Sequence, residues 1–237
     1  MKNNPVIQIK ELYKKYQIGK FDLNSLFFNR NKEILALENI NFNINRLDRI
    51  GVIGLNGSGK STLLKIISRV TYPTSGEVMI QGKVSSVLEA GSGFHPELTG
   101  LENIYLSGAI LGMNRKLVKQ KVEEIIIFSK IQDYINTPVK RYSSGMIIKL
   151  AFSVSAFLDG DILIFDEIMA VADDAFKKEA TSHILKQVDK TIIFVSHDER
   201  NIKDICNRAV LLEKGRLLLD GEVNKVFNEY NLLNKNN

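Results

Sequence analysis

A chain of 237 residues, 44% of them apolar, is long enough to form one large domain with a sizeable core. The formal net charge of +5 suits a phosphate ligand or an anionic surface and does not require a nucleic-acid partner. The single cysteine excludes an intramolecular disulfide, and no apolar run reaches the length of a transmembrane helix, so any role at a membrane is expected to come through a partner.

The periodicity of the apolar residues predicts strands and helices that alternate along the chain. Strands are predicted at residues 6–12, 34–44, 49–53, 77–80, 83–88, 161–165, 191–195, 208–213 and 216–219. Helices are predicted at residues 63–67, 101–111, 114–129, 144–158, 174–188, 198–206 and about 222–230. This order indicates an α/β core with a helical insertion at roughly 92–158 and a short tail at 231–237. Cys206 ends one of the apolar helical patterns and is expected to be a small buried core residue.

Residues 54–62 fit the phosphate-binding pattern G-x-x-x-x-G-K-[ST]. An apolar strand pattern precedes the loop and an apolar helical pattern follows it, which is the context that the motif requires and which argues against a chance glycine-rich turn. The glycines allow a tight turn with several N–H groups directed at a phosphate, and the helix adds its positive N-terminal end. Lys60 would reach the β- and γ-phosphates and Ser61 would ligate Mg²⁺. The predicted nucleotide-binding residues are Gly54, Asn56, Gly57, Ser58, Gly59, Lys60, Ser61 and Thr62.

Two carboxylates, Asp166 and Glu167, follow the continuous apolar run at 162–165. Such a run is typical of a strand that is covered on both faces, and the C-terminal edge of an open α/β sheet is where ligands bind. Asp166 can hold Mg²⁺ or its water shell, and Glu167 can polarise an attacking water. One carboxylate alone could be a helix cap, but two at a strand end in a chain with a phosphate loop indicate nucleotide hydrolysis.

Three weaker features leave alternatives open. The run Ser143-Ser144-Gly145 at the start of a predicted helix could be a second anion site or an ordinary serine N-cap, and in isolation the cap is favoured. His197 directly follows a buried strand, so it could sense a γ-phosphate or be a structural histidine. Tyr16 could stack on an adenine ring or pack at the end of a strand.

The segment at 17–33 is unusually rich in large apolar side chains for a loop between strands. Those side chains are Phe21, Leu23, Leu26, Phe27 and Phe28. The segment could fold onto the core, or it could be amphipathic and lie against lipid headgroups or a membrane partner.

Taken together and in this order, the phosphate loop, the serine–glycine helix start, the paired carboxylates and the histidine resemble the ATP-binding cassette (ABC) ATPase family. The resemblance covers about residues 6–230. Within that family the chain is similar to the ATPase subunits of polysaccharide exporters, which move teichoic acids, O-antigens or capsules. The stretches that carry this narrower similarity are residues 88–100, 102–113, 138–146 and 170–176.

The resemblance implies a role for each matching residue. It makes 54–62 the Walker A loop, Asp166 the Walker B aspartate, Glu167 the catalytic glutamate and His197 the switch histidine. It further implies that Ser143 to Met146 form the signature, with Ser144 and Met146 departing from the usual residues. By the same resemblance, Asp173 is the D-loop aspartate and Tyr16 the adenine-stacking aromatic. Where the family generally has a glutamine that contacts Mg²⁺, this chain has Glu89 as the polar candidate, with Ala90 as the other possible alignment.

The resemblance also implies a fold and a mechanism. The expected fold is a P-loop NTPase of the ABC type, a single α/β nucleotide-binding domain with an antiparallel β subdomain and a helical subdomain. The expected cofactors are ATP and Mg²⁺. Two copies are expected to form a head-to-tail homodimer that binds a transmembrane permease subunit, peripherally, on the cytoplasmic side of the inner membrane and without nucleic acid. The alternatives are an ATPase of another ABC transporter, such as an importer, a soluble non-transport ABC ATPase, or a degenerate scaffold, which intact Lys60 and Glu167 argue against.

Overall fold

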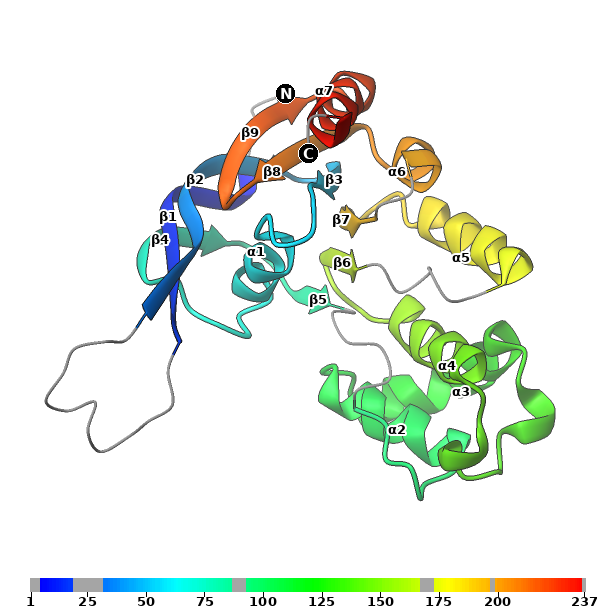
Figure 1. Ribbon diagram of the computed structural model, residues 1–237. Coiled ribbons are helices and arrows are strands. Elements are labelled where there is room, and N and C mark those ends of the chain that lie inside the picture. Colours follow the sequence, from blue (N-terminus) through cyan, green and yellow to red (C-terminus); the bar gives the residue numbers. More distant parts are fainter. Residues whose placement is uncertain (1–4, 19–31, 87–92, 167–172, 197–198, 236–237) are drawn as a thin grey trace, which may run out of the picture. The chain divides into compact units, whose positions relative to one another are not determined.

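The computed structural model describes residues 5–18, 32–86, 93–166, 173–196 and 199–235. These residues divide into two compact units, and each unit is defined by the contacts among its own residues (Figure 1). The first unit contains Met1–Gln81 and Cys206–Asn237, and the second contains Gly82–Ile205. The chain therefore leaves the first unit and returns to it, so residues distant in sequence meet within that unit.

An antiparallel sheet in the first unit has the strand order β2-β1-β4. Its strands are β1 (Pro5–Ile18), β2 (Lys32–Asn45) and β4 (Ser75–Ile80). β1 continues past the predicted end at residue 12, because Tyr16 still pairs with Ile34 of β2. Apolar alternation disappears at Lys14 and Lys15, so the sequence pattern did not indicate the strand pairing that continues there.

A second group of strands in the first unit contains β3 (Arg49–Ile53), β8 (Arg208–Glu213) and β9 (Arg216–Gly221). β3 pairs with β8 in parallel, and β8 forms an antiparallel hairpin with β9. Helix α1 (Lys60–Ile67) follows β3, and helix α7 (Val223–Lys235) ends the described chain. α7 continues five residues past its predicted end, into the segment that the sequence assigned to a tail, and Val226 and Phe227 are buried in its first turns.

The second unit contains a parallel arrangement of β5 (Val84–Ser86), β6 (Ile162–Asp166) and β7 (Thr191–Val195). β6 pairs with β5 on one side and with β7 on the other. Every residue of β7 is buried, as expected for a strand covered on both faces. Helices α5 (Asp174–Lys186) and α6 (Glu199–Ile205) flank β7 in sequence.

Three helices of the second unit form the insertion that the sequence predicted: α2 (Gly100–Ile110), α3 (Arg115–Ser129) and α4 (Ser144–Ala156). Two short 3-10 turns, Gln132–Tyr134 and Val139–Arg141, connect α3 to α4. Thr99 and Glu102 form a reciprocal capping box at the start of α2. Aromatic rings join α4 to α5, with Phe152 edge-on to Phe176 at 5.7 Å between ring centroids.

Cys206 lies one residue after the end of α6 rather than inside the helix as predicted, and it is buried as expected. Burial raises the pKa of its thiol to about 12, which keeps the thiol neutral. Within the described ranges, no helix is both long and apolar enough to cross a membrane.

Arg208 at the start of β8 fixes the base of the β8–β9 hairpin. Its guanidinium donates to both carboxylate oxygens of Asp220 on β9, at 2.7 and 2.6 Å, and to Asp48 in the β2–β3 turn at 3.0 Å. The two carboxylates raise the pKa of Arg208 further. Because all three groups are mostly buried, these charge-assisted bonds stabilise the hairpin more than a surface pair would.

Arg208→Met is expected to lower the free energy of unfolding by about 2–3 kcal/mol, because it leaves two partly buried carboxylates without their donor. The measurement is urea unfolding followed by circular dichroism. Arg115→Met, at an exposed position on α3, is the control and is expected to change stability by less than about 0.5 kcal/mol. Equal stability of the two variants would contradict a structural role for the Arg208 network.

Candidate functional site

The phosphate loop runs from the end of β3 to the start of α1, and its glycines are required by the backbones around it. A Cβ at Gly54 would lie 2.3 Å from the carbonyl oxygen of Leu212 on β8. A Cβ at Gly59, whose φ is +106°, would lie 2.8 Å from the carbonyl oxygen of Ala36 on β2. Two strands therefore press on the loop from outside, and only glycine fits at these contacts.

Lys60 places a cation inside this loop. Its side chain is buried, and Nζ donates to the carbonyl oxygens of Gly54 at 2.7 Å and Leu55 at 3.0 Å. A buried ammonium needs hydrogen-bond partners, and the two loop carbonyls are among those of Lys60. The loop therefore holds the lysine of the predicted phosphate-binding motif among its own backbone groups.

Helix α1 begins at Lys60, and Gly59 occupies its N-cap position without a capping side chain. The amide groups of the first turn of α1 can thus donate to an anion. Ser61 is exposed at this end of the helix, and Asn56 is exposed in the loop. Glycine-dependent packing and an uncapped helix start are compatible with a phosphate ligand, and the nucleotide-binding role of these residues stays a prediction.

Tyr16 lies on β1 in the same unit as the phosphate loop, and its side chain is 38% exposed. Nζ of Lys14 lies 4.9 Å from the centroid of the Tyr16 ring. The same ammonium donates to the hydroxyl of Thr71 at 3.0 Å and to the carbonyl oxygen of Tyr72 at 2.8 Å. The partly exposed ring therefore lies beside a lysine that two hydrogen bonds hold in place, and its stacking on adenine stays a prediction.

In the second unit, Asp166 is the last residue of β6, so it lies at the C-terminal end of a parallel strand. This is the position that the sequence predicted for a ligand-binding carboxylate. Glu89, Glu167 and His197, together with the apolar segment at 19–31, lie outside the described residues.

The serine–glycine start of α4 has the geometry of a helix cap. Oγ of Ser143 accepts from the backbone N–H of Met146 at 3.2 Å, while Ser143 and Ser144 are exposed. This is the cap that the sequence favoured when the motif was considered alone. A hydroxyl that accepts this bond keeps its own O–H, and Gly145 adds no side chain, so the exposed helix start can also receive an anion.

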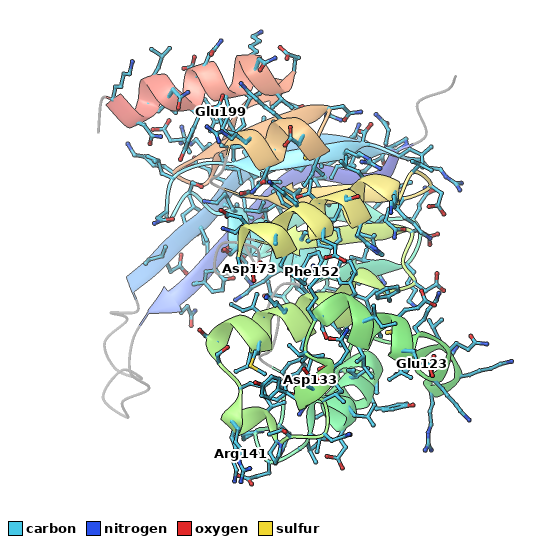
Figure 2. The ribbon with its side chains drawn as sticks, turned by 90° about the vertical axis from the view of Figure 1, so that its right-hand side faces the viewer. Glu123, Asp133, Arg141, Phe152, Asp173 and Glu199 are labelled. Atoms are coloured by element: carbon cyan, nitrogen blue, oxygen red, sulfur yellow. The ribbon has the colours of Figure 1, made fainter. Side chains whose placement is uncertain are left out.

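Asp173 caps α5 and connects that helix to α4. One carboxylate oxygen accepts from the N–H of Phe176 at 2.9 Å, and the other forms an ion pair with Lys149 of α4. The hydrogen bond from Lys149, followed by the one from Phe176, lowers the pKa of Asp173. Figure 2 shows Asp173 at one end of α5 and Phe152 between α4 and α5.

Sequence reasoning missed Lys14 and Lys149. Each was one lysine among many, and neither belongs to a motif. Only their contacts, with Tyr16 in one case and Asp173 in the other, distinguish them from solvated surface charges.

Comparison with known proteins finds a family and relatives that match most of the chain. The family described as ABC transporter matches residues 37–170. The ABC transporter protein AbcA of Aeromonas salmonicida is 42% identical over 98% of this chain and 77% of its own length. The O-antigen export system ATP-binding protein RfbB of Klebsiella pneumoniae is 40% identical over 96% of this chain and 98% of its own length. The teichoic acids export ATP-binding protein TagH of Staphylococcus epidermidis is 38% identical over 94% of this chain and 87% of its own length.

Solved structures agree on the fold. The dimeric post-hydrolysis state of the ATP-binding cassette MJ0796, bound to ADP and phosphate, has a TM-score of 0.77 and 22% identity. The matched region covers 92% of this chain and 98% of the MJ0796 chain. The expected mixed α/β cassette fold with an antiparallel β sheet is thereby confirmed.

Lys149→Met is expected to raise the pKa of Asp173 toward the ordinary aspartate value, because the ammonium that favours the carboxylate is removed. A depressed pKa stabilises the fold above the unfolded-state pKa, and this contribution is lost as pH falls through the folded-state pKa. The Lys149→Met variant is therefore expected to lose less stability than the wild type on acidification. A carboxyl ¹³C NMR titration measures the shift in the pKa of Asp173. Lys177→Met is the control. It removes a longer ion pair within α5, between Lys177 and Asp174 at 3.7 Å, and is expected to leave the pKa of Asp173 unchanged. An unchanged Asp173 titration in Lys149→Met would refute the assignment.

Proposed function

The chain belongs to the ABC transporter family, and we propose that it is the ATP-hydrolysing subunit that energises export of a cell-surface polysaccharide through a separate transmembrane subunit. The observation that carries ATP hydrolysis is the phosphate loop with buried Lys60, in a chain of this family. The export assignment rests on relatives named for O-antigen and teichoic acid export, which align with nearly the whole chain.

ATP binding uses groups of the first unit. The loop amides and Lys60 hold the β- and γ-phosphates, and the exposed ring of Tyr16 stacks on adenine. Ser61 and Asp166 supply oxygen ligands of the kind that Mg²⁺ prefers, with Glu89 as a third candidate. When bound, Mg²⁺ neutralises charge on the phosphates.

Hydrolysis in this proposal depends on positioning more than on covalent chemistry. Glu167 orients the attacking water toward the γ-phosphate, and His197 contacts that phosphate from the following strand end. Lys60 stabilises the charge that develops on the phosphate oxygens. Water is the acceptor of the phosphate.

A second copy of the chain completes the site. Ser143–Gly145 at the exposed start of α4 would contact the γ-phosphate that the partner's phosphate loop holds, which gives the helix cap a role as an anion site. Asp173 would lie at the same interface. Exposure of these groups supports such a contact, and so does the dimeric state of the solved MJ0796 cassette. ATP then joins the two copies, and hydrolysis separates them.

The transmembrane subunit is the proposed partner, and it would hold the homodimer at the cytoplasmic face of the inner membrane. The helices α2–α4 are the proposed contact region because they are an insertion into the nucleotide-binding fold. The names of the relatives favour an exporter over the ATPase of an importer or a soluble ABC protein. They include both O-antigen and teichoic acid systems, so the substrate class is a cell-surface polysaccharide.

Glu167→Gln is expected to bind ATP normally and to hydrolyse it at least ~100-fold more slowly, because the amide cannot accept a proton from water. The variant should accumulate as an ATP-bound dimer, which size-exclusion chromatography with light scattering detects. Glu123→Gln, an equivalent change at an exposed position on α3 (Figure 2), is expected to retain full turnover. Wild-type turnover in Glu167→Gln would remove Glu167 from the mechanism.

Export is tested in cells that lack the chromosomal gene for this chain. The wild-type chain is expected to restore polysaccharide to the cell surface, and Glu167→Gln is expected not to. Phe27→Ser with Phe28→Ser is expected to weaken co-purification with the transmembrane subunit and to leave nucleotide binding intact, because only the apolar contact is removed. Unchanged export and assembly would mean that this segment packs on the chain's own core.

A further inference from the structure

The tip of the β8–β9 hairpin supports the phosphate loop from outside. The N–H of Gly215 donates to the carbonyl oxygen of Ser58 in the loop at 3.0 Å. The carbonyl oxygen of Gly215 accepts from the N–H of Glu38 on β2 at 2.7 Å. One residue of the hairpin thus bridges the phosphate loop and β2, all within the first unit (Figure 1).

This bridge has no room for a side chain at position 215. Gly215 is buried with a φ of +81°, and a Cβ there would lie 2.8 Å from the carbonyl oxygen of Ala36. The same oxygen limits Gly59 of the loop, whose added Cβ would also lie 2.8 Å away. Two glycines that are distant in sequence therefore approach a single carbonyl, which fixes the distance between the loop, the hairpin and β2.

A salt bridge anchors the hairpin tip in this place. Arg216 donates through Nε to Oε2 of Glu38 at 2.9 Å and through a second nitrogen to Oε1 at 2.5 Å. The hydrogen bond from Arg216 lowers the pKa of Glu38, so the carboxylate is charged at neutral pH. The fork geometry orients the turn beside the backbone bond between Glu38 and Gly215.

The bridge determines how a peptide group of the loop is oriented. In a planar trans peptide, the C=O and the following N–H point in opposite directions. Since the Ser58 carbonyl is turned toward Gly215, the N–H of Gly59 is turned away from the hairpin. In the phosphate-binding motif, the amides of such a loop face the phosphate.

We propose that Gly215 is a positioning residue for nucleotide binding, which holds the Ser58–Gly59 peptide with its N–H directed at the phosphate. This role rests on the proposed function of the loop as the ATP site. Gly215 touches no nucleotide and acts only through the loop. Through Gly215, the β8–β9 hairpin contributes to phosphate recognition, although it lies outside the sequence motif at residues 54–62.

The test is Gly215→Ala, with ADP as the ligand in isothermal titration calorimetry. The added methyl must displace the tip from Ala36 and lengthen the bond to Ser58, so the dissociation constant for ADP is expected to rise about tenfold or more. Gly112→Ala is the matched control, since Gly112 has the same φ of +81° and nothing within 4 Å of an added Cβ. It introduces the same backbone strain without the clash, and its dissociation constant is expected to stay within about twofold of wild type.

An NMR readout separates positioning from general destabilisation. In ¹⁵N-labelled wild-type protein, ADP is expected to shift the Gly59 amide resonance strongly, because that N–H donates to a phosphate. The shift is expected to shrink in Gly215→Ala and to persist in Gly112→Ala. A full Gly59 shift and a wild-type dissociation constant in Gly215→Ala would overturn the proposal.

Arg216→Gln tests the same proposal if Gly215→Ala does not fold. It weakens the anchor without adding volume, and Arg216 is largely exposed, so folding is expected to survive. Its dissociation constant for ADP is expected to rise about two- to fivefold, in line with the loss of a modest ion pair. An unchanged affinity and an unchanged Gly59 shift would then overturn the proposal. Failure of the wild-type chain itself to bind ADP would instead refute the proposed ATP site.

Discussion

The close approach of three backbone segments at the phosphate loop is the constraint on which the rest of the site depends. β8 contacts the loop at Gly54, β2 contacts it at Gly59, and the hairpin tip bonds to Ser58. A side chain at either of these loop glycines, or at Gly215, would meet a carbonyl oxygen, so the loop keeps one shape. Lys60 is hydrogen-bonded to two carbonyls of this loop, and α1 begins directly after Gly59.

The charged and hydrogen-bonding groups of the loop decide which kind of ligand fits this shape. Lys60 is buried and donates to two neutral carbonyls, and α1 begins without a capping side chain. The uncapped start of α1 favours an anion, which would accept from the first amides of the helix. In the second unit, Asp173 at the start of α5 is paired with Lys149 of α4. The helix that begins at the serine–glycine run and the helix that Asp173 caps are therefore held together by an ion pair.

Periodicity and spacing predicted most of the described elements. The nine predicted strands and the helices of the insertion are present, because buried strands and amphipathic helices must repeat apolar residues at fixed intervals. β1 extends past its predicted end through two lysines, where apolar alternation is missing, because its backbone pairs with β2. α7 continues over residues 231–235, where Leu232 is exposed. The position of Ser143 as an N-cap was also predictable, since it follows from residue type alone.

The sequence by itself determined which family the chain resembles and predicted a phosphate-binding loop at residues 54–62, because a loop motif is contiguous and its chemistry is local. Only the tertiary structure decided that Gly215 bonds to Ser58, that Lys149 pairs with Asp173, and that Lys14 bonds to Thr71. These contacts join different segments of the chain, and they recur at no fixed interval. The fold creates them by bringing distant backbones within hydrogen-bonding distance, and no pattern along the chain encodes that distance.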